Sequence, residues 1–446
     1  MNRRHFLAST ATALASVQFG FNARAEASLA PAASKDDLRT AAANAWIWGL
    51  PLIEMAEQRA ARFAEGVKPN TFQHQRALVT AKGQFVTTPN NDTLYSQAWL
   101  NLEKGPVTIS VPASGSRYYC LPLMDMYSNN FAIVGTRTSG ASARTFTVVG
   151  PHETANIPQA IRAPTNSVWI LGRTLVDGDA DLSKAHAFQD GWTIKGPPSD
   201  APRSYAKRSA PWNEFFAAVQ ALMNENPPPV TDSRMLDSIA PLLQFGKTFD
   251  PSRFSPEQVA EIKAGIGEYA NRLLQIRKNT LVHNGWSFPR YSMGDFGQDY
   301  DYRAAVAIGG LGALPRVEAM YLRAGGPEGR GFDSAKSWKL AFTPDQLPPV
   351  DSFWSLSMYR LMPDGALYFI ENPIDRYTVG DRTAGLKRGP DGLLEIVMSR
   401  VQPASSPNVN WVPTPADGNF VPILRAYLPK AALLEGSYQL PAIQPI

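Results

Sequence analysis

Residues 107–135 read VTISVPASGSRYYCLPLMDMYSNNFAIVG, a series of short apolar runs separated by turn residues. Apolar and polar side chains alternate over 107–111, which is typical of a strand with one buried face. The Pro-Ala-Ser-Gly sequence that follows predicts a turn. Strands are predicted at five places in this region: 107–111, 118–123, 131–135, 145–149 and 168–171. The spacing favours a β-rich module with one face of its sheet buried.

Helices are predicted on both sides of this module. Residues 36–65 carry apolar side chains from Leu38 to Met55 at helical intervals, and Gly49 and Pro51 should bend or interrupt that helix. Ser255 followed by Pro256 is typical of a helix start. After residue 172 further helices are predicted at 181–189, 212–224, 234–245, 256–282 and 302–310.

Strands dominate again after about residue 317, with candidates at 355–361, 367–372 and 393–399. Strands grouped around a run of helices favour an α+β fold over a doubly wound βαβ fold. We therefore expect two β-rich, sandwich-like modules with a helical insert and an N-terminal helix. The expected boundaries are an N-terminal α+β module over 36–172, a helical insert over 173–285 and a C-terminal β-rich module over 286–446.

The N-terminus resembles a twin-arginine signal peptide over residues 1–25. Arg3 and Arg4 precede a weakly apolar stretch, and Ala23-Arg24-Ala25 fits a small-x-small cleavage site. We expect cleavage near Ala25, a flexible leader over 26–35, and export to the periplasm or medium by the twin-arginine machinery. Removing residues 1–25, which hold three arginines and no acid, lowers the formal net charge from +4 to +1.

Composition excludes several classes of protein. No apolar run of about 18 residues occurs, so no membrane span is predicted. No block of basic residues occurs, so no nucleic-acid partner is predicted. A single cysteine, Cys120, excludes an intramolecular disulfide, and its apolar neighbours predict a buried side chain. The motifs GxSxG, GxxxxGK[ST], GxGxxG and HExxH are all absent.

Neither a cofactor nor a metal is predicted. After the predicted cleavage the chain keeps four histidines, and none of them forms a close pair with another: His74, His152, His186 and His283. A metal site assembled across the fold from His74 or His283 with carboxylates stays open.

Three polar segments follow or precede apolar runs: 87–95, 124–130 and 371–382. Each has two interpretations. Their amides and carboxylates are suited to capping and turn formation, and the acids and arginines of the last segment to a loop-holding ion-pair network. Polar loop residues beside apolar strands are also the usual source of ligand contacts.

These segments carry a resemblance to two families. The stretches TPNNDTLYSQAWLNL (88–102) and RYYCLPLMDMYSNNFAIVGTRTSG (117–140) resemble the domain-of-unknown-function family numbered 1254. Four later stretches resemble a companion family, numbered 1214. They are DYDYRAAVAIGGLGALP (299–315), FWSLSMYRL (353–361), NPIDRYTVGDR (372–382) and NWVPTPADGNFVPILRAYLPK (410–430). The resemblance implies two β-rich modules with helical decoration in an exported bacterial protein.

The resemblance also implies a set of site residues, suited to acid–base work by Asp or Tyr with Arg holding an anionic oxygen. The predicted acid–base residues are Asp92, Asp125, Tyr95 and Tyr127. The predicted substrate-binding residues are Asn90, Asn91, Arg137, Tyr302, Arg303, Asp375 and Arg376. Asp381 and Arg382 fall on the same motifs.

From this set we expect an exported enzyme, a hydrolase in preference to a redox enzyme, acting on a small or oligomeric organic ligand. A non-catalytic periplasmic binding or assembly protein and a metal-dependent oxidoreductase are the alternatives. The sequence leaves the oligomeric state open, a homo-oligomer included.

Overall fold

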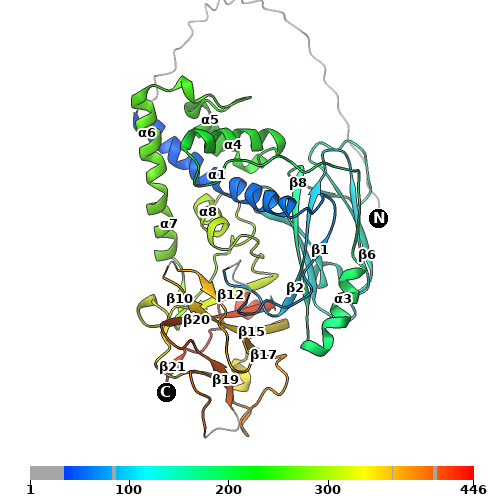
Figure 1. Cartoon of the computed structure of the whole chain (residues 1–446), viewed down its shortest axis with the longest axis vertical. Helices are drawn as coiled ribbons and strands as arrows, with labels where there is room; N and C mark the ends of the chain where they lie inside the picture. Colours follow the sequence, from blue (N-terminus) through cyan, green and yellow to red (C-terminus); the bar gives the residue numbers. More distant parts are fainter. Residues whose placement is uncertain (1–34, 83–86, 364, 405–408) are drawn as a thin grey trace, which may run out of the picture.

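The computed structural model describes residues 35–82, 87–363, 365–404 and 409–446 (Figure 1). The predicted signal peptide (1–25) and all but the last residue of the predicted leader (26–35) lie outside these ranges. Within them the fold is α+β, with several sheets and a long N-terminal helix. The fold class predicted from the sequence is therefore confirmed.

The first module is a sandwich of two sheets. Its strands are β1 (Gln73–His74), β2 (Thr93–Asn101), β3 (Val107–Val111), β4 (Tyr119–Met124), β5 (Asn130–Gly135), β6 (Arg144–Val149), β7 (Ile161–Arg162), β8 (Ser167–Leu175) and β9 (Thr193–Lys195). One sheet has the order β1-β2-β8-β4-β5 and the other β7-β6-β3-β9. Ala98, Ile109 and Ile170 belong to one buried cluster between the two sheets. This alternation of apolar residues is what the sequence shows over 107–111.

The first module extends beyond the boundary expected at residue 172. Strand β8 continues to Leu175, and β9 pairs with β3 through Thr108 and Lys195. Helix α3 (Leu182–Asp190) lies between these strands and places Phe188 in the same sandwich core. The helical part of the chain therefore begins after residue 195.

The second module is also a sandwich. Its strands are β10 (Val282–His283), β11 (Trp286–Ser287), β12 (Ala319–Ala324), β13 (Phe332–Asp333), β14 (Trp338–Phe342), β15 (Val350–Leu361), β16 (Leu367–Tyr368), β17 (Thr378–Gly380), β18 (Leu394–Ser399), β19 (Val409–Pro413), β20 (Asn419–Pro429) and β21 (Gln444–Pro445). An eight-stranded sheet follows the order β10-β11-β12-β20-β15-β16, with β13 on β20 and β17 on β15. It packs on the sheet β19-β18-β14-β21, with Leu356, Leu340 and Ile396 in the shared core. The strand predicted over 367–372 ends at Tyr368.

A helical layer lies beside the upper part of the first module, to its left in Figure 1. Its helices are α1 (Lys35–Ala64), α4 (Trp212–Glu225), α5 (Ser233–Leu243), α6 (Pro256–Gly267), α7 (Tyr269–Lys278) and α8 (Tyr300–Gly309). Helix α1 runs without a break through Pro51, so of the expected bend or interruption the interruption is absent. Helix α6 begins with a capping box, in which the Ser255 hydroxyl accepts from the Gln258 amide and the Gln258 side chain accepts from the Ser255 amide.

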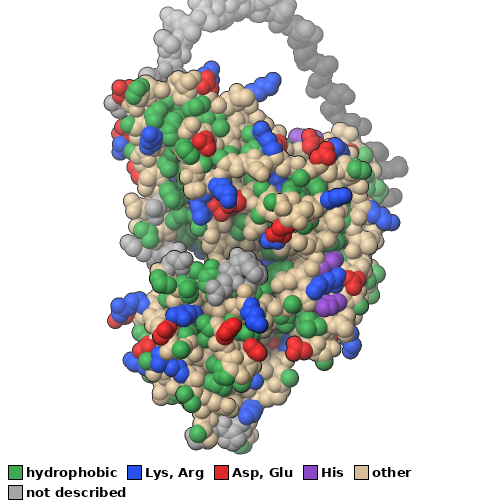
Figure 2. Space-filling view, viewed as in Figure 1, with side chains coloured by type: hydrophobic (Ala, Val, Ile, Leu, Met, Phe, Trp, Pro, Cys, Tyr) green, Lys and Arg blue, Asp and Glu red, His purple; other side chains and the backbone are tan. Residues whose placement is uncertain are grey.

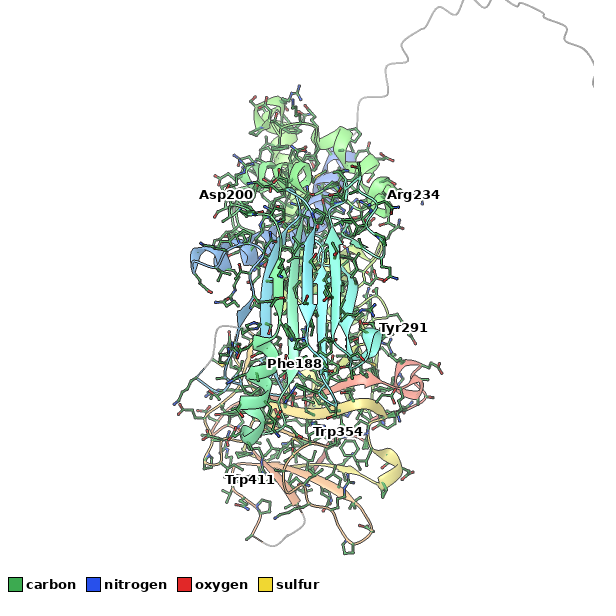
Figure 3. All side chains as sticks on the ribbon, turned by 90° about the vertical axis from the view of Figure 1, so that its right-hand side faces the viewer. Phe188, Asp200, Arg234, Tyr291, Trp354 and Trp411 are labelled. Atoms are coloured by element: carbon green, nitrogen blue, oxygen red, sulfur yellow. The ribbon has the colours of Figure 1, made fainter. Side chains whose placement is uncertain are left out.

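The outer face of the five-stranded sheet has two different partners. Near one end Trp99 and Trp169 stack with their ring centroids 5.7 Å apart, within the core that α1 fills. Near the other end Tyr118 packs against Phe353 and Tyr427 of the second module. Figure 3 shows the strands of the first module running lengthwise onto the second module, where β15 crosses below them. The joint between the modules lies at this lower end of the sheet.

No helix in the described ranges is long and apolar enough to cross a membrane. On the face seen in Figure 2, basic and acidic side chains are interspersed, and no large patch of one sign is visible there.

Candidate functional site

A buried polar cluster lies where the two modules meet. Three neighbouring strands of the first module place Tyr95 opposite Arg173 and Arg173 opposite Cys120. Three strands of the second module place Tyr321 opposite Arg425 and Arg425 opposite Ser355. We name this set the junction cluster, with members Asn90, Asp92, Tyr95, Arg173, Tyr321, Ser355, Ser357, Tyr359, Arg425 and Tyr427.

The alternation of side chains along strands β15 and β20 places these polar residues at the joint between the modules. Along β15, Trp354, Leu356 and Met358 fill the core of the second sandwich. Because successive side chains of a strand point to opposite faces, Ser355 and Ser357 face the first module instead. Strand β20 follows the same rule, with Leu424 and Ala426 in the core and Arg425 and Tyr427 on the opposite face.

Asp92 reaches the second module from the turn before β2. Its carboxylate accepts a hydrogen bond of 2.7 Å from the Ser355 hydroxyl. Asn90 shapes this turn, since its side-chain oxygen accepts from the Asp92 amide at 2.7 Å and its amide donates to Thr93 and Tyr427. Burial raises the pKa of Asp92, and the nearby Arg425 guanidinium and the Ser355 hydrogen bond oppose that rise. The carboxyl group therefore binds a proton more readily than an exposed aspartate.

Arg425 is buried and holds the segment before β2. Its guanidinium donates to the Ser357 hydroxyl at 2.7 Å and to the carbonyl oxygens of Thr88 and Pro89 at 3.0 and 3.1 Å. The Tyr359 hydroxyl donates to the same Pro89 oxygen at 2.7 Å. Thr88 has a φ of 52°, which is costly for a β-branched residue, so these contacts hold a strained backbone at the junction.

Arg173 is the second buried guanidinium. It donates to the carbonyl oxygens of Leu171 and Gly312, both at 2.9 Å. Gly312 has a φ of +86°, and a Cβ there would lie 2.8 Å from the Leu171 side chain, so the approach of this loop requires glycine. The Arg173 Nε atom is buried and has no acceptor among the described residues. Neither Arg173 nor Arg425 makes an ion pair with a carboxylate in the described part of the chain.

Tyr95 and Tyr321 lie near both arginines. The Arg173 guanidinium sits 5.4 Å from the centroid of the Tyr95 ring. Burial raises the pKa of Tyr321 to about 12, while Arg173 and Arg425 both lower it. Both tyrosines are half-buried rather than fully enclosed. Neither hydroxyl has a hydrogen-bond partner within the described ranges, in contrast to Tyr359 and Tyr427.

Asp381 marks the rim of the cluster. Its carboxylate accepts from the Trp354 amide at 3.2 Å, one residue before Ser355. Partial burial raises the pKa of Asp381 to about 6, and the nearby Asp92 contributes to that rise. Beside it, Arg382 forms an ion pair of 2.6 Å with Asp177 of the first module. An ion pair between the modules thus stands at the rim next to two neighbouring carboxyl groups.

Arg137 and Cys120 lie beside the cluster in structural roles. The buried Glu318 carboxylate accepts from Arg137 at 2.7 Å and from the Tyr118 hydroxyl at 2.8 Å, which ties the modules together. Arg137, predicted to bind substrate, is therefore paired with the Glu318 carboxylate. Cys120 is buried, as predicted, and burial raises the pKa of its thiol to about 12.

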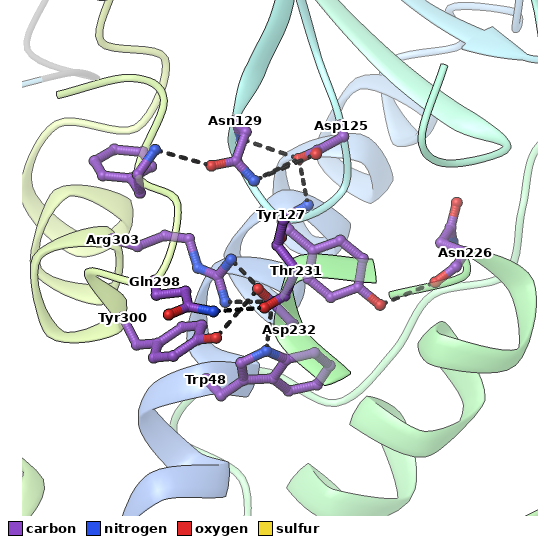
Figure 4. A network of polar contacts seen from close by, with 11 residues as sticks. Trp48, Asp125, Tyr127, Asn129, Asn226, Thr231, Asp232, Gln298, Tyr300 and Arg303 are labelled. Atoms are coloured by element: carbon purple, nitrogen blue, oxygen red, sulfur yellow. Dashed lines mark hydrogen bonds and ion pairs between the residues drawn. The ribbon is translucent and has the colours of Figure 1, made fainter. Parts of the chain in front are cut away.

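Asp125 and Tyr127 belong to a different network, under the helical layer (Figure 4). The Asp125 carboxylate accepts from the backbone amides of Tyr127 and Asn129, both at 2.9 Å. The Tyr127 hydroxyl donates to the Asn226 carbonyl at 2.9 Å. Burial raises the pKa of Asp125 to about 6, and its hydrogen bonds with Asn129 oppose the rise. Both residues are fully buried, and these contacts form the loop after β4.

Arg303 joins this helical network through a buried ion pair. Both Arg303 and Asp232 have side chains only 1% exposed, and their closest atoms lie 3.2 Å apart. The indole of Trp48 donates to the same Asp232 carboxylate at 2.7 Å, and the Tyr300 hydroxyl donates to it at 3.3 Å. Arg303, predicted to bind substrate, holds α8 to the helical insert.

The remaining predicted residues lie outside the cluster. The Tyr302 hydroxyl accepts from the Arg290 amide. Asn91 donates to the Val79 carbonyl at 2.7 Å. Arg376 is half-buried and donates to the Trp411 carbonyl at 2.9 Å, while Asp375 is exposed and accepts from Tyr377.

Most of the predicted site residues are thus divided among three places. Asn90, Asp92 and Tyr95 come together in the junction cluster. Asp125, Tyr127 and Arg303 lie in the helical network, and Asp375 and Arg376 lie on a loop beside β19. The expectation of one pocket containing all of them does not hold, because the Asp125 and Arg376 side chains have their own, unrelated partners.

Several cluster members were not singled out in the sequence: Arg173, Tyr321, Ser355, Ser357, Tyr359, Arg425 and Tyr427. The signal was the alternation in FWSLSMYRL, where two serines interrupt an apolar strand at every second position. Among the described residues no group of three or more His, Cys, Asp or Glu side chains is placed to hold a metal ion.

Two family matches divide the chain in the same way as the structure. Residues 69–196 match the family described as "Protein of unknown function (DUF1254)", and residues 318–431 match "Protein of unknown function (DUF1214)". The chain carries a DUF1254 domain followed by a DUF1214 domain. Asp92, Tyr95 and Arg173 lie in the DUF1254 domain, and Tyr321, Ser355 and Arg425 lie in the DUF1214 domain. The junction cluster is therefore shared between the two domains.

A solved structure shares the fold. The VPA0106 protein from Vibrio parahaemolyticus matches with a TM-score of 0.70 and 25% identity, covering 93% of this chain and 100% of that one. A putative uncharacterized protein from Burkholderia cenocepacia matches with a TM-score of 0.43 and 11% identity, covering 92% of this chain and 94% of that one. No curated protein matches the DUF1254–DUF1214 chain.

Proposed function

We propose that this protein is an exported enzyme, a hydrolase, that acts on a small organic substrate at the junction cluster. The observation that carries the proposal is the pair of buried guanidiniums, Arg173 and Arg425, which have no carboxylate ion-pair partner in the described ranges. A buried charge is costly unless it is paired. An anionic group of a ligand, or an oxyanion that develops during a reaction, would supply the missing charge.

Asp92 is the proposed acid–base group. Its raised pKa moves the carboxyl group toward the range in which one group can both accept and return a proton. In the proposed step, Asp92 takes a proton from water as the water oxygen attacks the acyl carbon of an ester. The carbon–oxygen bond to the leaving group then breaks, and the leaving oxygen receives that proton. The products are a carboxylic acid and an alcohol, and the guanidiniums stabilise the intermediate oxyanion.

A panel of p-nitrophenyl esters of aliphatic and aromatic acids tests this proposal. We expect turnover by the parent protein and at least a hundredfold loss of kcat in Asp92→Asn, since positioned acid–base groups contribute about 100-fold to 10,000-fold. Asp417→Asn is the matched control, because Asp417 is an exposed aspartate paired with Arg360. Equal rates in the parent and Asp92→Asn, or no turnover of any ester, would count against the hydrolase.

A non-catalytic binding protein is the second candidate. It is favoured because both guanidiniums donate to backbone carbonyl oxygens, which is a structural role. Arg173 donates to Gly312, and Arg425 donates to Thr88 and Pro89. Binding of an organic anion without turnover would support this candidate. The metal-dependent oxidoreductase stays a prediction, and near-stoichiometric metal in protein purified without a histidine tag would support it.

Export to the periplasm or medium is part of the proposal. Replacing Arg3-Arg4 with Lys-Lys should leave uncleaved precursor in the cytoplasm, because lysine keeps the charge but not the guanidinium fork. Fractionation followed by immunoblotting measures this. Undiminished export of the double variant would assign the protein to another secretion route.

A further inference from the structure

We infer that the ligand of the junction cluster is a small aromatic monocarboxylate, whose carboxylate accepts hydrogen bonds from the Tyr95 and Tyr321 hydroxyls between Arg173 and Arg425. This inference rests on the location given in the proposed function, and it concerns binding alone rather than turnover.

The two tyrosines and two arginines face a common place. Tyr95 lies opposite Arg173 on β2 and β8, and Tyr321 lies opposite Arg425 on β12 and β20. Tyr95 and Tyr321 each interact electrostatically with both guanidiniums, although the two pairs come from different modules. The four side chains therefore converge across the joint instead of pointing apart.

Unused donors are concentrated at this place. The Nε of Arg173 is buried without an acceptor in the described part of the chain, and the half-buried hydroxyls of Tyr95 and Tyr321 donate none of the hydrogen bonds found there. Arg173 itself is only 4% exposed, so its unpaired Nε is costly in the empty protein. A carboxylate has about four lone-pair sites on two oxygens and can accept from several such donors together.

The charge balance favours one negative charge. Arg173 and Arg425 supply two positive charges, and ionised Asp92 offsets one of them from its position near Arg425 and Ser355. Arg173 is then left without an anion. Asp381 adds negative charge at the rim, where Arg382 and Asp177 form their own pair. A second charge on the ligand would have to lie beside Asp92 and Asp381, which disfavours dianions.

The aromatic residues of the joint favour an aromatic body. Leu314, Phe353 and Tyr427 form a buried cluster next to the polar residues. The rings of Phe353 and Tyr427 are stacked, with centroids 4.2 Å apart, and Tyr118 packs edge-on against both. The half-buried rings of Tyr95 and Tyr321 keep aromatic surface accessible beside this cluster, and a planar ring attached to the carboxylate would lie against them, where aromatic pairs gain stability beyond area burial.

Calorimetric titration with benzoate tests the inference. The variants are Tyr321→Phe and Tyr95→Phe, which remove one hydroxyl each and break no hydrogen bond within the described residues. We expect saturable binding to the parent and about tenfold weaker binding to each variant, with unchanged melting temperatures. Tyr438→Phe is the control, because its hydroxyl donates to the Gln346 carbonyl and neither residue belongs to the junction cluster; benzoate affinity should be unaltered.

Three further probes sharpen the test. Benzamide has the same shape without the charge, acetate has the charge without the ring, and inorganic phosphate is a non-planar anion. All three should bind at least tenfold more weakly than benzoate. Benzamide, acetate or phosphate binding as tightly as benzoate, no benzoate binding, or full affinity in both tyrosine variants would overturn the inference.

The outcomes separate this inference from the proposed enzyme. Benzoate binding with the expected tyrosine dependence, but no ester turnover, contradicts the hydrolase and leaves the ligand class standing. Ester turnover that depends on Asp92, together with no affinity for benzoate, contradicts the ligand class and leaves the hydrolase standing.

Discussion

The Ser355 hydroxyl donates a hydrogen bond of 2.7 Å to the Asp92 carboxylate, although the two residues lie 263 positions apart in the chain. Ser355 belongs to the DUF1214 domain and Asp92 to the DUF1254 domain. Ser355 is 2% exposed, so this contact is inside the joint rather than on its surface. The contact links the proposed acid–base group to the stability of the interface between the domains.

A double-mutant cycle on Asp92 and Ser355 measures that link. Ser355→Ala leaves a largely buried carboxylate without its hydroxyl donor, and we expect a loss of about 1–3 kcal/mol in the free energy of unfolding at neutral pH. Asp92→Asn removes the charge, so Ser355→Ala should cost less in that background. Chemical denaturation of the parent, both single variants and the double variant gives the coupling energy. A coupling energy near zero would show that the contact does not stabilise the joint.

Stability should fall as the pH rises through the titration of Asp125. The unfolded carboxyl group has a pKa of about 4, whereas burial raises the folded pKa to about 6. The folded state therefore holds the proton more tightly, and ionisation between about pH 4 and pH 6 destabilises it by roughly 2–3 kcal/mol. In Asp125→Asn, which keeps an acceptor for the Tyr127 and Asn129 amides, the decrease should be smaller by about this amount, because only the raised pKa values of Asp92 and Asp381 still contribute to it. Urea denaturation at about pH 4 and about pH 7 measures it; parallel pH profiles for the two proteins would contradict the assignment.

The buried ion pair of Asp232 and Arg303 should stabilise the fold because each residue neutralises the charge of the other. Arg303→Met leaves Asp232 with the Trp48 and Tyr300 donors but no cation, and we expect a loss of about 3–5 kcal/mol. Asp232→Asn in the Arg303→Met background should restore part of that loss, because it removes the unpaired charge. Thermal melts of the three variants measure this, with Arg330→Met, from an exposed pair with Glu328, as the control. No recovery in the double variant would contradict a charge-based origin.

Arg376 should contribute little to stability. It is half-buried and donates one hydrogen bond of 2.9 Å to the Trp411 carbonyl, so Arg376→Ala should cost about 1 kcal/mol. Benzoate binding should be unaffected, because Arg376 lies outside the junction cluster. A melt of the variant together with a benzoate titration measures both. A loss above about 3 kcal/mol or a lost affinity would restore the predicted pocket role.

The architecture was predictable because its signals are local. Alternation over 107–111, turn residues between apolar runs and the Ser255-Pro256 start each depend on a few neighbouring residues, and the corresponding elements are present. Pro51 shows the limit of such signals. The chain continues as one helix through Pro51, within a buried core that surrounds Leu50, Leu52 and Ile53.

The site was only partly predictable because it is made of pairings between distant strands. Asn90, Asp92 and Tyr95 stood out as polar residues in a turn and at the start of a strand, and they do belong to the junction cluster. Arg425 and Ser355 sit inside apolar strands, and their role depends on which sheet faces them. A single sequence does not give that pairing. Asp125 and Arg376 also stood out as polar residues, but their segments form loops in separate parts of the fold, outside the junction cluster.

The central claim is that the junction cluster binds an aromatic carboxylate. Crystals of the protein soaked with 4-bromobenzoate test it most directly, because the anomalous signal of bromine locates the ligand. The account predicts one bromine site at the junction, with the carboxylate between Tyr95 and Tyr321 and within hydrogen-bond distance of both hydroxyls. Two hollows away from the junction offer competing places, one lined by Trp46 and Trp212 and the other by Trp286 and Trp338. Bromine in either hollow with an empty junction would contradict the account.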